Sequence, residues 1–344
     1  TINKANLRIL SVNGYEPKIY VSSYSPGIDI QASNVIFGSG STGENGFKIY
    51  GNIEASGGPT FRISSGADEA VIRDNTILAI SGEIGNTALL VESGSEGIEF
   101  TGNTVTDFDQ GISLQDGSNC IISSDNTFNH VTHPIYHGAT ISGTFTYYGT
   151  IQDAIDESPI DETVSVVSGN FTENLQINKS ISLLGANEDE NPTDGVRDQE
   201  TIINGQTLSP IRIVQETENV TIKGFTFTIP NKSTSSNEAG VLIGPGTHNI
   251  IIENNIFKNI TDGSGADTTS DESYAVMIYG RNDVIGGQSN IEVVNNVIEN
   301  VEEYGIAIND NTSFVTISGN IIKNLIGSDH STEGYPPWDP SWPT

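Results

Sequence analysis

The chain has 344 residues, of which 14 are Lys or Arg and 44 are Asp or Glu, so its formal net charge is −30. A charge of this size repels nucleic acid and anionic membranes, so neither is expected as a partner. It fits a protein that holds cations or stays soluble in high salt, and it fits a well-solvated surface equally well. Cys120 is the only cysteine, which excludes a disulfide within the chain, and its apolar neighbours favour a small core residue. No apolar run approaches the length needed to span a bilayer.

The beginning of the chain has a counterpart in its second half. Residues 1–10 read as Ile-Asn-Lys followed by an alternating strand, and residues 176–185 read in the same way. Two copies of one domain are therefore predicted, at 1–143 and 144–327. Because Thr1 is not an initiator methionine, the sequence is interpreted as a processed or excised piece, and its first coil is expected to be cut or to meet another chain.

The second copy has a longer entrance than the first. The spacing of apolar side chains in residues 150–159 predicts a short amphipathic helix, which ends at Pro159. Strands are predicted directly after it, at 163–167 and 169–175. A helix laid over the open end of a repeat array covers strand edges that would otherwise associate, so this helix is predicted to be a cap.

One template of eleven residues recurs through both copies. It has apolar residues at positions 1, 3, 8 and 11 and Asn at position 6. The alternation at positions 1 and 3 is typical of a strand with one buried face, and the Gly, Asn or Asp that follows accepts a positive φ cheaply, so the chain turns there. The copies lie at 70–80, 98–108, 250–260, 291–301 and 315–325, with a looser one at 121–131.

A companion strand precedes most copies, so one coil is predicted to be strand, turn, strand, turn and short strand. The spacing between equivalent asparagines supports this length, with 23 residues from Asn103 to Asn126 and 24 from Asn296 to Asn320. Coils stacked at about 4.8 Å form a solenoid. The predicted fold is all-β: a right-handed parallel β-helix with two tandem domains and a short capping helix before the second.

The Asn at position 6 is predicted to have a structural role. We expect it in the left-handed region at an outer corner of each coil, where its amide bonds to the equivalent Asn one coil away. The members of this ladder are Asn75, Asn103, Asn126, Asn255, Asn296 and Asn320.

The repeats resemble the parallel β-helix repeats of the pectin-lyase-like superfamily. The order of helix, strand, Gly-x-aromatic-x-Glu-Asn at 169–174 and then Ile-Asn-Lys resembles the entrance of pectin methylesterase-like and related surface β-helix proteins. The resemblance implies the fold. It also raises the expectation of an enzyme, since the superfamily includes lyases, hydrolases and esterases of acidic polysaccharides.

The motifs of those enzymes are not matched. Of the polygalacturonase-like set, only His137-Gly138 is present, without an Asp-Asp pair, so a two-carboxylate site is not supported. The Gln and two Asp of the methylesterase-like enzymes have no equivalent after Leu184. The arginines that a lyase would need as a base are scattered, and Arg73 beside Asp74 is interpreted as a solvated surface pair. These residues are Arg62, Arg73, Arg212 and Arg281.

Two acidic loops and a histidine cluster are the candidate metal sites. Residues 189–195 resemble a calcium loop that is one residue too long and lacks the closing Glu. Ca²⁺ is therefore a candidate cofactor, with plain acidic loops as the alternative. The candidate ligands are Asp189, Asn191 and Asp194 in one loop and Asp262, Asp267 and Asp271 in the other. His130, His133 and His137 are interpreted as a polar bend rather than a transition-metal site, because Pro134 prevents a regular helix face.

The second copy also carries sequons and leads to an unusual tail. Six Asn-x-Ser/Thr sequons occur there, and glycosylation is considered at Asn231 and Asn311 first, then at Asn170 and Asn219. The tail, residues 328–344, is rich in Pro and contains Tyr335, Trp338 and Trp342. It is interpreted as a linker to another domain or as a segment that docks on a neighbouring subunit.

The functional prediction combines these points. We expect an extracellular or cell-surface, acidic structural or adhesive protein without catalysis, with copies of itself, other surface proteins or a polysaccharide as partners. The alternative is a polysaccharide lyase or hydrolase, of tail-spike-like type, that acts on acidic polysaccharide. A third interpretation is a carbohydrate-binding module that uses Ca²⁺.

Overall fold

The structure is a computed structural model. It describes residues 1–4, 6–11, 17–21, 26–40, 45–51, 58–79, 85–231, 238–261, 272–281 and 287–326. In this part of the chain the strands form five sheets, and α1 (Ile151–Glu157) is the one helix. No helix within it is long and apolar enough to cross a membrane.

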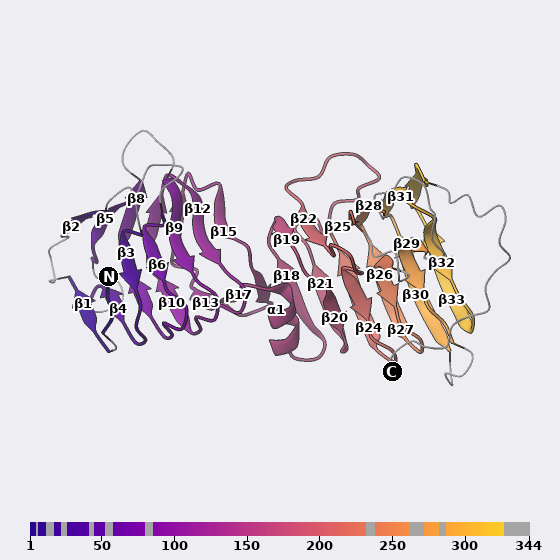
Figure 1. Cartoon of the computed structure of the whole chain (residues 1–344), viewed down its shortest axis with the longest axis horizontal. Helices are drawn as coiled ribbons and strands as arrows, with labels where there is room; N and C mark the ends of the chain where they lie inside the picture. Colours follow the sequence, from indigo (N-terminus) through magenta and orange to yellow (C-terminus); the bar gives the residue numbers. More distant parts are fainter. Residues whose placement is uncertain are drawn as a thin grey trace.

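Two sheets belong to the first half of the chain, and each is parallel (Figure 1). The β2 sheet contains β2 (Lys18–Tyr20), β5 (Lys48–Gly51), β8 (Thr76–Ala79), β11 (Thr104–Thr106) and β14 (Thr127–Asn129). The β3 sheet contains β3 (Ile28–Ile30), β6 (Phe61–Ile63), β9 (Gly85–Val91), β12 (Phe108–Leu114) and β15 (His133–Tyr136).

Two corresponding parallel sheets belong to the second half. The β19 sheet contains β19 (Gly169–Phe171), β22 (Thr201–Asn204), β25 (Phe225–Ile229), β28 (Ile256–Ile260), β31 (Val297–Val301) and β34 (Ile321–Lys323). The β20 sheet contains β20 (Leu175–Ile177), β23 (Ile211–Ile213), β26 (Glu238–Ile243), β29 (Ser273–Ile278) and β32 (Tyr304–Ile308).

The fifth sheet, called the shared sheet here, runs through both halves. Its first-half strands are β1 (Arg8–Leu10), β4 (Ile36–Gly38), β7 (Val71–Arg73), β10 (Ile98–Thr101) and β13 (Asn119–Ile122). Its middle strands are β17 (Thr146–Tyr148) and β16 (Ala139–Ile141). Its second-half strands are β18 (Glu162–Val166), β21 (Ile181–Leu184), β24 (Glu218–Lys223), β27 (His248–Glu253), β30 (Gln288–Val294) and β33 (Thr312–Ser318).

Each coil contributes one strand to each of three sheets, and equivalent residues of successive coils pair in register. Val105 of β11 lies opposite Ile77 of β8, and Ile112 of β12 lies opposite Leu89 of β9. All four side chains point inward and are fully buried. The apolar template positions therefore stack into a continuous core, which confirms the predicted parallel β-helix.

The two halves have separate cores on opposite faces of the shared sheet. Between β13 and β18, three antiparallel pairings through β17 and β16 reverse the strand direction. Tyr147 lies opposite Cys120 and packs against the first core, whereas the next residue, Tyr148, packs against the second. Successive strand residues point to opposite faces, so the interior changes face at this hairpin. The domain boundary predicted at 143/144 falls in its turn, and the division into two domains stays a prediction.

The predicted capping helix is confirmed as α1. Thr150 is its N-cap, and its hydroxyl accepts a hydrogen bond of 3.0 Å from the Asp153 amide. The Glu173 carboxylate accepts from the amides of Ile151 and Gln152 at 3.0 and 3.1 Å. Burial raises the pKa of Glu173, and the two amide hydrogen bonds oppose that shift. The Glu of the entrance motif thus fixes the start of the helix that covers the second core.

The asparagine ladder is confirmed, but its position was predicted wrongly. The Oδ1 of Asn103 accepts from the Asn75 amide at 3.0 Å, and the Oδ1 of Asn296 accepts from the Asn255 amide at 2.9 Å. These four side chains are buried, with at most 1% exposed, rather than on outer corners. The left-handed conformation belongs instead to the residue before five of the six ladder asparagines, namely Asp74, Gly102, Asn254, Asn295 and Gly319. The preceding residue makes the turn, so the Asn can point inward to reach the amide of the neighbouring coil.

Candidate functional site

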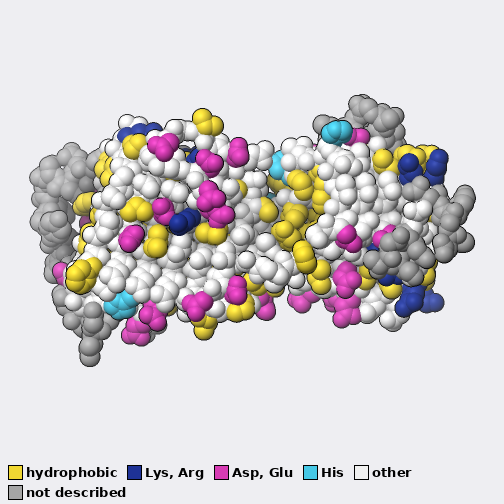
Figure 2. All heavy atoms as spheres, turned by 180° about the vertical axis from the view of Figure 1, so that it is seen from behind, with side chains coloured by type: hydrophobic (Ala, Val, Ile, Leu, Met, Phe, Trp, Pro, Cys, Tyr) yellow, Lys and Arg dark blue, Asp and Glu magenta, His cyan; other side chains and the backbone are white. Residues whose placement is uncertain are grey.

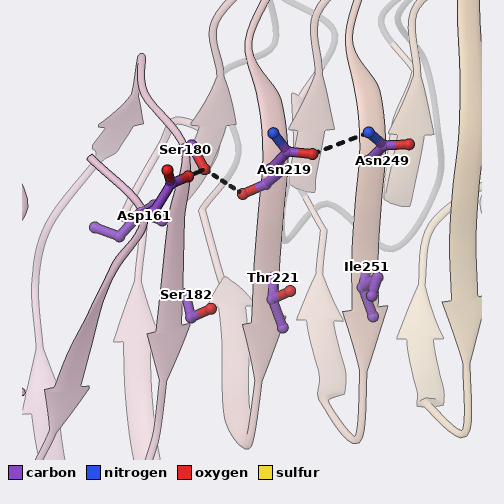
Figure 3. Close-up of a pocket in the computed structure, with 8 residues that line it drawn as sticks. Asp161, Ser180, Ser182, Asn219, Thr221, Asn249 and Ile251 are labelled. Carbon is purple, nitrogen blue, oxygen red and sulfur yellow. Dashed lines mark hydrogen bonds between the residues drawn. The ribbon is translucent and has the colours of Figure 1, made fainter.

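A shallow polar groove of about 330 Å³ lies on the second half of the shared sheet (Figure 3). Strands β21, β24 and β27, together with the residues directly before β18 and β21, supply its walls. The lining residues are Asp161, Ser180, Ile181, Ser182, Asn219, Thr221, Asn249 and Ile251.

An exposed row of amides forms one side of this groove. Asn219, Asn249 and Asn290 lie near the starts of the successive strands β24, β27 and β30, and all have a φ near +55°. The Asn249 Nδ2 donates to the Asn219 Oδ1 at 2.9 Å, and the Asn290 Nδ2 donates to the Asn249 Oδ1 at 3.1 Å. Asn tolerates the left-handed turn, and stacking repeats it at each coil, so local conformation and register together build the row.

Hydroxyl groups and one carboxylate complete the groove. The Ser180 hydroxyl donates to the Asp161 carboxylate, and its Oγ lies 3.2 Å from the Asn219 carbonyl oxygen. Ser182 and Thr221 lie opposite each other in the next row of the sheet. The lining set offers donors and acceptors for a polyhydroxylated ligand. It includes no His, Cys, Lys or Arg to act with the carboxylate as an acid/base pair.

A second concave region, near the C-terminal coil, includes one predicted glycosylation site. It is lined by Ile308, Asn309, Asp310, Asn311 and Thr312. Asn311 is exposed, but its Nδ2 donates to the Arg281 carbonyl at 3.2 Å. The other candidate acceptors Asn170, Asn219 and Asn231 are also exposed. Glycosylation at these four positions stays a prediction.

The loop predicted to bind calcium, residues 189–195, is held by a hydrogen bond within itself. Asn191 Oδ1 accepts from the Thr193 amide at 3.0 Å and from its hydroxyl at 2.8 Å. Within the described ranges no three His, Cys, Asp or Glu side chains gather as metal ligands. Calcium binding by Asp189, Asn191 and Asp194 stays a prediction. The other proposed ligands, Asp262, Asp267 and Asp271, and the assembly residues Tyr335, Trp338 and Trp342 lie outside the described residues.

An arginine that the sequence did not single out anchors this loop to the solenoid. The Arg197 Nη1 donates to the Asn254 carbonyl at 2.9 Å, and its Nη2 pairs with Glu200 at 2.9 Å. Its side chain is only 4% exposed. Burial lowers the pKa of Arg197, and Glu200 opposes that shift. No repeat or motif signals this contact, because its partners lie 57 residues apart.

The arginines considered for catalysis in the first half are held in structural contacts. Arg62 donates to both oxygens of Asp29, at 3.0 and 2.8 Å, and Ser64 and Gln31 donate to the same carboxylate. The hydrogen bonds from Arg62 lower the pKa of Asp29, although burial opposes this. Arg73 donates to two backbone carbonyls, those of Ser39 and Gly40. A carboxylate held ionised by a bidentate arginine is a poor general acid, so this cluster stabilises the fold.

The three clustered histidines do not converge on one point. His130 pairs with Asp107 at 3.2 Å, and His133 lies 3.8 Å from Asp109. His137 instead stacks between Tyr136 and Phe171, with ring centroids 4.8 and 4.9 Å apart. This stack joins the two halves of the chain. Burial lowers the pKa of His137, against the opposing effect of Asp116.

The His137 stack predicts a loss of stability in mild acid. A folded-state pKa below the ordinary value of 6.5 means that protonation favours the unfolded chain. This contribution is present above pH 6.5 and is lost as the pH falls through the folded-state pKa. Urea unfolding of His137→Asn between pH 7 and pH 5 should therefore show a shallower decline than the wild type.

His130→Asn is the matched control, because His130 also has a positive φ but its side chain is 87% exposed. The pH profile of this variant should lie closer to that of the wild type than the profile of His137→Asn does. Equal flattening of the profile in both variants would contradict a specific role for the stack.

Comparison with known proteins agrees with this architecture. Residues 165–332 match a family model described as "Right handed beta helix region". The matched region is just under half of the chain, and the match supports the right-handed parallel β-helix and the pectin-lyase-like repeats that the sequence predicted. Among solved structures, the A-module of mannuronan C-5 epimerase AlgE6 from Azotobacter vinelandii is similar, at 14% identity and a TM-score of 0.33, over 89% of this chain and 80% of that module. A similarity this distant says nothing of activity. No curated protein matches the chain.

Proposed function

We propose that this chain is a structural and adhesive module of the cell exterior, without catalysis, whose polar groove binds the hydroxyl groups of a glycan. The observation that carries the proposal is the exposed amide row beside Ser182 and Thr221. Sugars present hydroxyls that both donate and accept, and amides and hydroxyls of the protein match both roles.

The shape of the groove supports a polymer rather than a small metabolite. The groove is open, and its lining groups recur from coil to coil at the strand spacing of about 4.8 Å. A chain that lies along the solenoid would contact several coils at once, and linked weak contacts give a useful combined affinity.

The exposed apolar surface of the last described coil supports a proposed contact with a further protein, either another copy of this chain or another surface protein. Exposed apolar side chains gather there, including Ile317, Ile321, Ile322 and Leu325, each between 42% and 47% exposed. Apolar surface concentrated in one place is typical of a protein contact.

Filling the groove should weaken glycan binding. Thr221→Arg places a long side chain in the centre of the lining and should weaken retention on immobilised dextran, cellulose or xylan by about tenfold or more. Thr104→Arg is the control, since it makes the same change at a half-buried strand position on the β2 sheet. Loss of retention in both variants, or retention of the wild type on none of the three glycans, would refute the proposal. Release of reducing sugar from any of them would contradict the absence of catalysis.

A further inference from the structure

Two lysines on the outer face of the β2 sheet lie side by side at the N-terminal end of the solenoid. Lys18 of β2 is exposed and pairs in register with Lys48 of β5. Like charges directly opposite in a sheet repel each other. Neither ammonium group has a carboxylate partner among the described residues.

This pair is an exception to the charge pattern of the molecule. In the described strands, every other register pair between two charged side chains joins opposite charges. These pairs are Asp29 with Arg62, Lys223 with Glu253, Lys258 with Glu299, and Glu299 with Lys323. In a chain with 44 acidic residues, two lysines that lie opposite each other in the described strands form a local positive charge.

Aromatic rings complete the site. Tyr20 and Tyr50 follow the two lysines on the same face and stack with centroids 4.6 Å apart and an interplanar angle of 6°. The Lys48 ammonium lies 6.0 Å from the centroid of the Tyr50 ring. Tyr20 is 68% exposed, and β2 is the edge strand of its sheet. One face of its ring is therefore available to stack against the apolar C–H face of a sugar.

The charge near these lysines favours an anion, although the net charge of the whole chain is strongly negative. Residues 1–50 contain four basic and three acidic side chains, in contrast to the 14 and 44 of the whole chain. Figure 2 shows Lys and Arg gathered at this end of the molecule, whereas Asp and Glu predominate over the rest of the face shown. Charges beyond about 10 Å are largely screened at 0.1 M salt, so nearby charges influence binding more than distant ones.

We propose that Lys18, Lys48 and Tyr20 form a binding site for a carboxylate-bearing sugar unit of an acidic polysaccharide. The two ammonium groups bind the carboxylate, and the exposed ring supports the pyranose. Among anionic glycans a carboxylated one fits better than a sulfated one, because its lower charge density is repelled less by the remaining acidic surface. This site lies on a different face and in a different half of the chain from the glycan groove, and it does not depend on it.

The test measures binding of the whole chain to polygalacturonate by affinity electrophoresis, with dextran sulfate and neutral dextran as comparisons. Lys18→Gln with Lys48→Gln should weaken binding about tenfold at about 0.05 M NaCl and reduce its salt dependence. Tyr20→Ala should weaken binding without changing the salt dependence. The control is Lys258→Gln with Lys323→Gln, which removes the same charge from lysines that face Glu299 and should retain binding within about twofold.

Several results would overturn the proposal. Equal weakening in both lysine doubles would mean that net charge alone acts, and binding of dextran sulfate but not polygalacturonate would mean a wrong ligand class. Self-association of the wild type in sedimentation that the Lys18/Lys48 double abolishes would mean that the site serves a second copy. The Lys18/Lys48 double should leave retention on neutral dextran unchanged, because neither lysine lines the groove, so failure of the groove and failure of this site are distinguishable.

Discussion

Replacing Asn255 by Ala should lower the free energy of unfolding by about 2–4 kcal/mol. The Asn255 Oδ1 accepts from the Phe225 amide at 3.0 Å, and its Nδ2 donates to the Ile222 carbonyl at 3.0 Å. The side chain is fully buried. Ala removes both partners in a place that water does not reach, so a buried amide is left without an acceptor. The loss is measured by urea unfolding followed by far-ultraviolet circular dichroism.

The exposed amide row provides the control for this prediction. Asn249 also bonds to equivalent asparagines on both sides, but it lies on the surface. Asn249→Gly removes its amide without strain at a positive φ and should cost less than about 1 kcal/mol, because water replaces the lost bonds. If the two variants lost equal stability, burial would not be the reason that the inner ladder stabilises the coil.

The coil could be predicted because its signal is repeated. Interior positions such as Ile72, Phe100 and Ile122 occupy the same places in successive coils, and each copy strengthens the prediction that one face is buried. The ladder could be predicted for the same reason. Its orientation could not, since positions 5 and 6 of the template are both residues that favour turns. Only the path of the backbone decides which of the two takes the positive φ.

The junction between the halves carries no such signal. The residues of β16 and β17 do not show which face is interior, because the change of interior face depends on how these strands pair with β13 and β18. The capping helix was predictable because the apolar spacing at Ile151, Ala154 and Ile155 is local. Pairing between distant strands has no local signal.

The candidate sites could be predicted only in part, because they too depend on pairing between distant strands. Asn219 was noted as a sequon, but its amide row with Asn249 and Asn290 depends on register across coils. Lys18 and Lys48 are 30 residues apart in the chain and become neighbours only because β2 pairs with β5. Each site combines residues from several coils, so no contiguous motif marks it.

The close approach of two backbones at Gly38 predicts a second large loss of stability, on substitution of this glycine. Gly38 pairs with Arg73 across β4 and β7, and a Cβ at Gly38 would lie 1.9 Å from the Arg73 carbonyl oxygen. That oxygen belongs to the backbone of the adjacent strand and cannot move without breaking the pairing. The φ of +143° is also costly for any residue with a side chain. Gly38→Ala should therefore cost about 3–5 kcal/mol in urea unfolding.

Gly66→Ala separates the steric clash from the backbone strain. Gly66 has a φ of +74°, but nothing lies within 4 Å of a Cβ built there. The same substitution should cost only the strain of the left-handed conformation, about 1–2 kcal/mol. A loss at Gly38 no larger than that at Gly66 would mean that β4 and β7 are not packed at the spacing described. The spacing between successive coils in the first half would then differ from the one described, because this contact fixes the distance between β4 and β7.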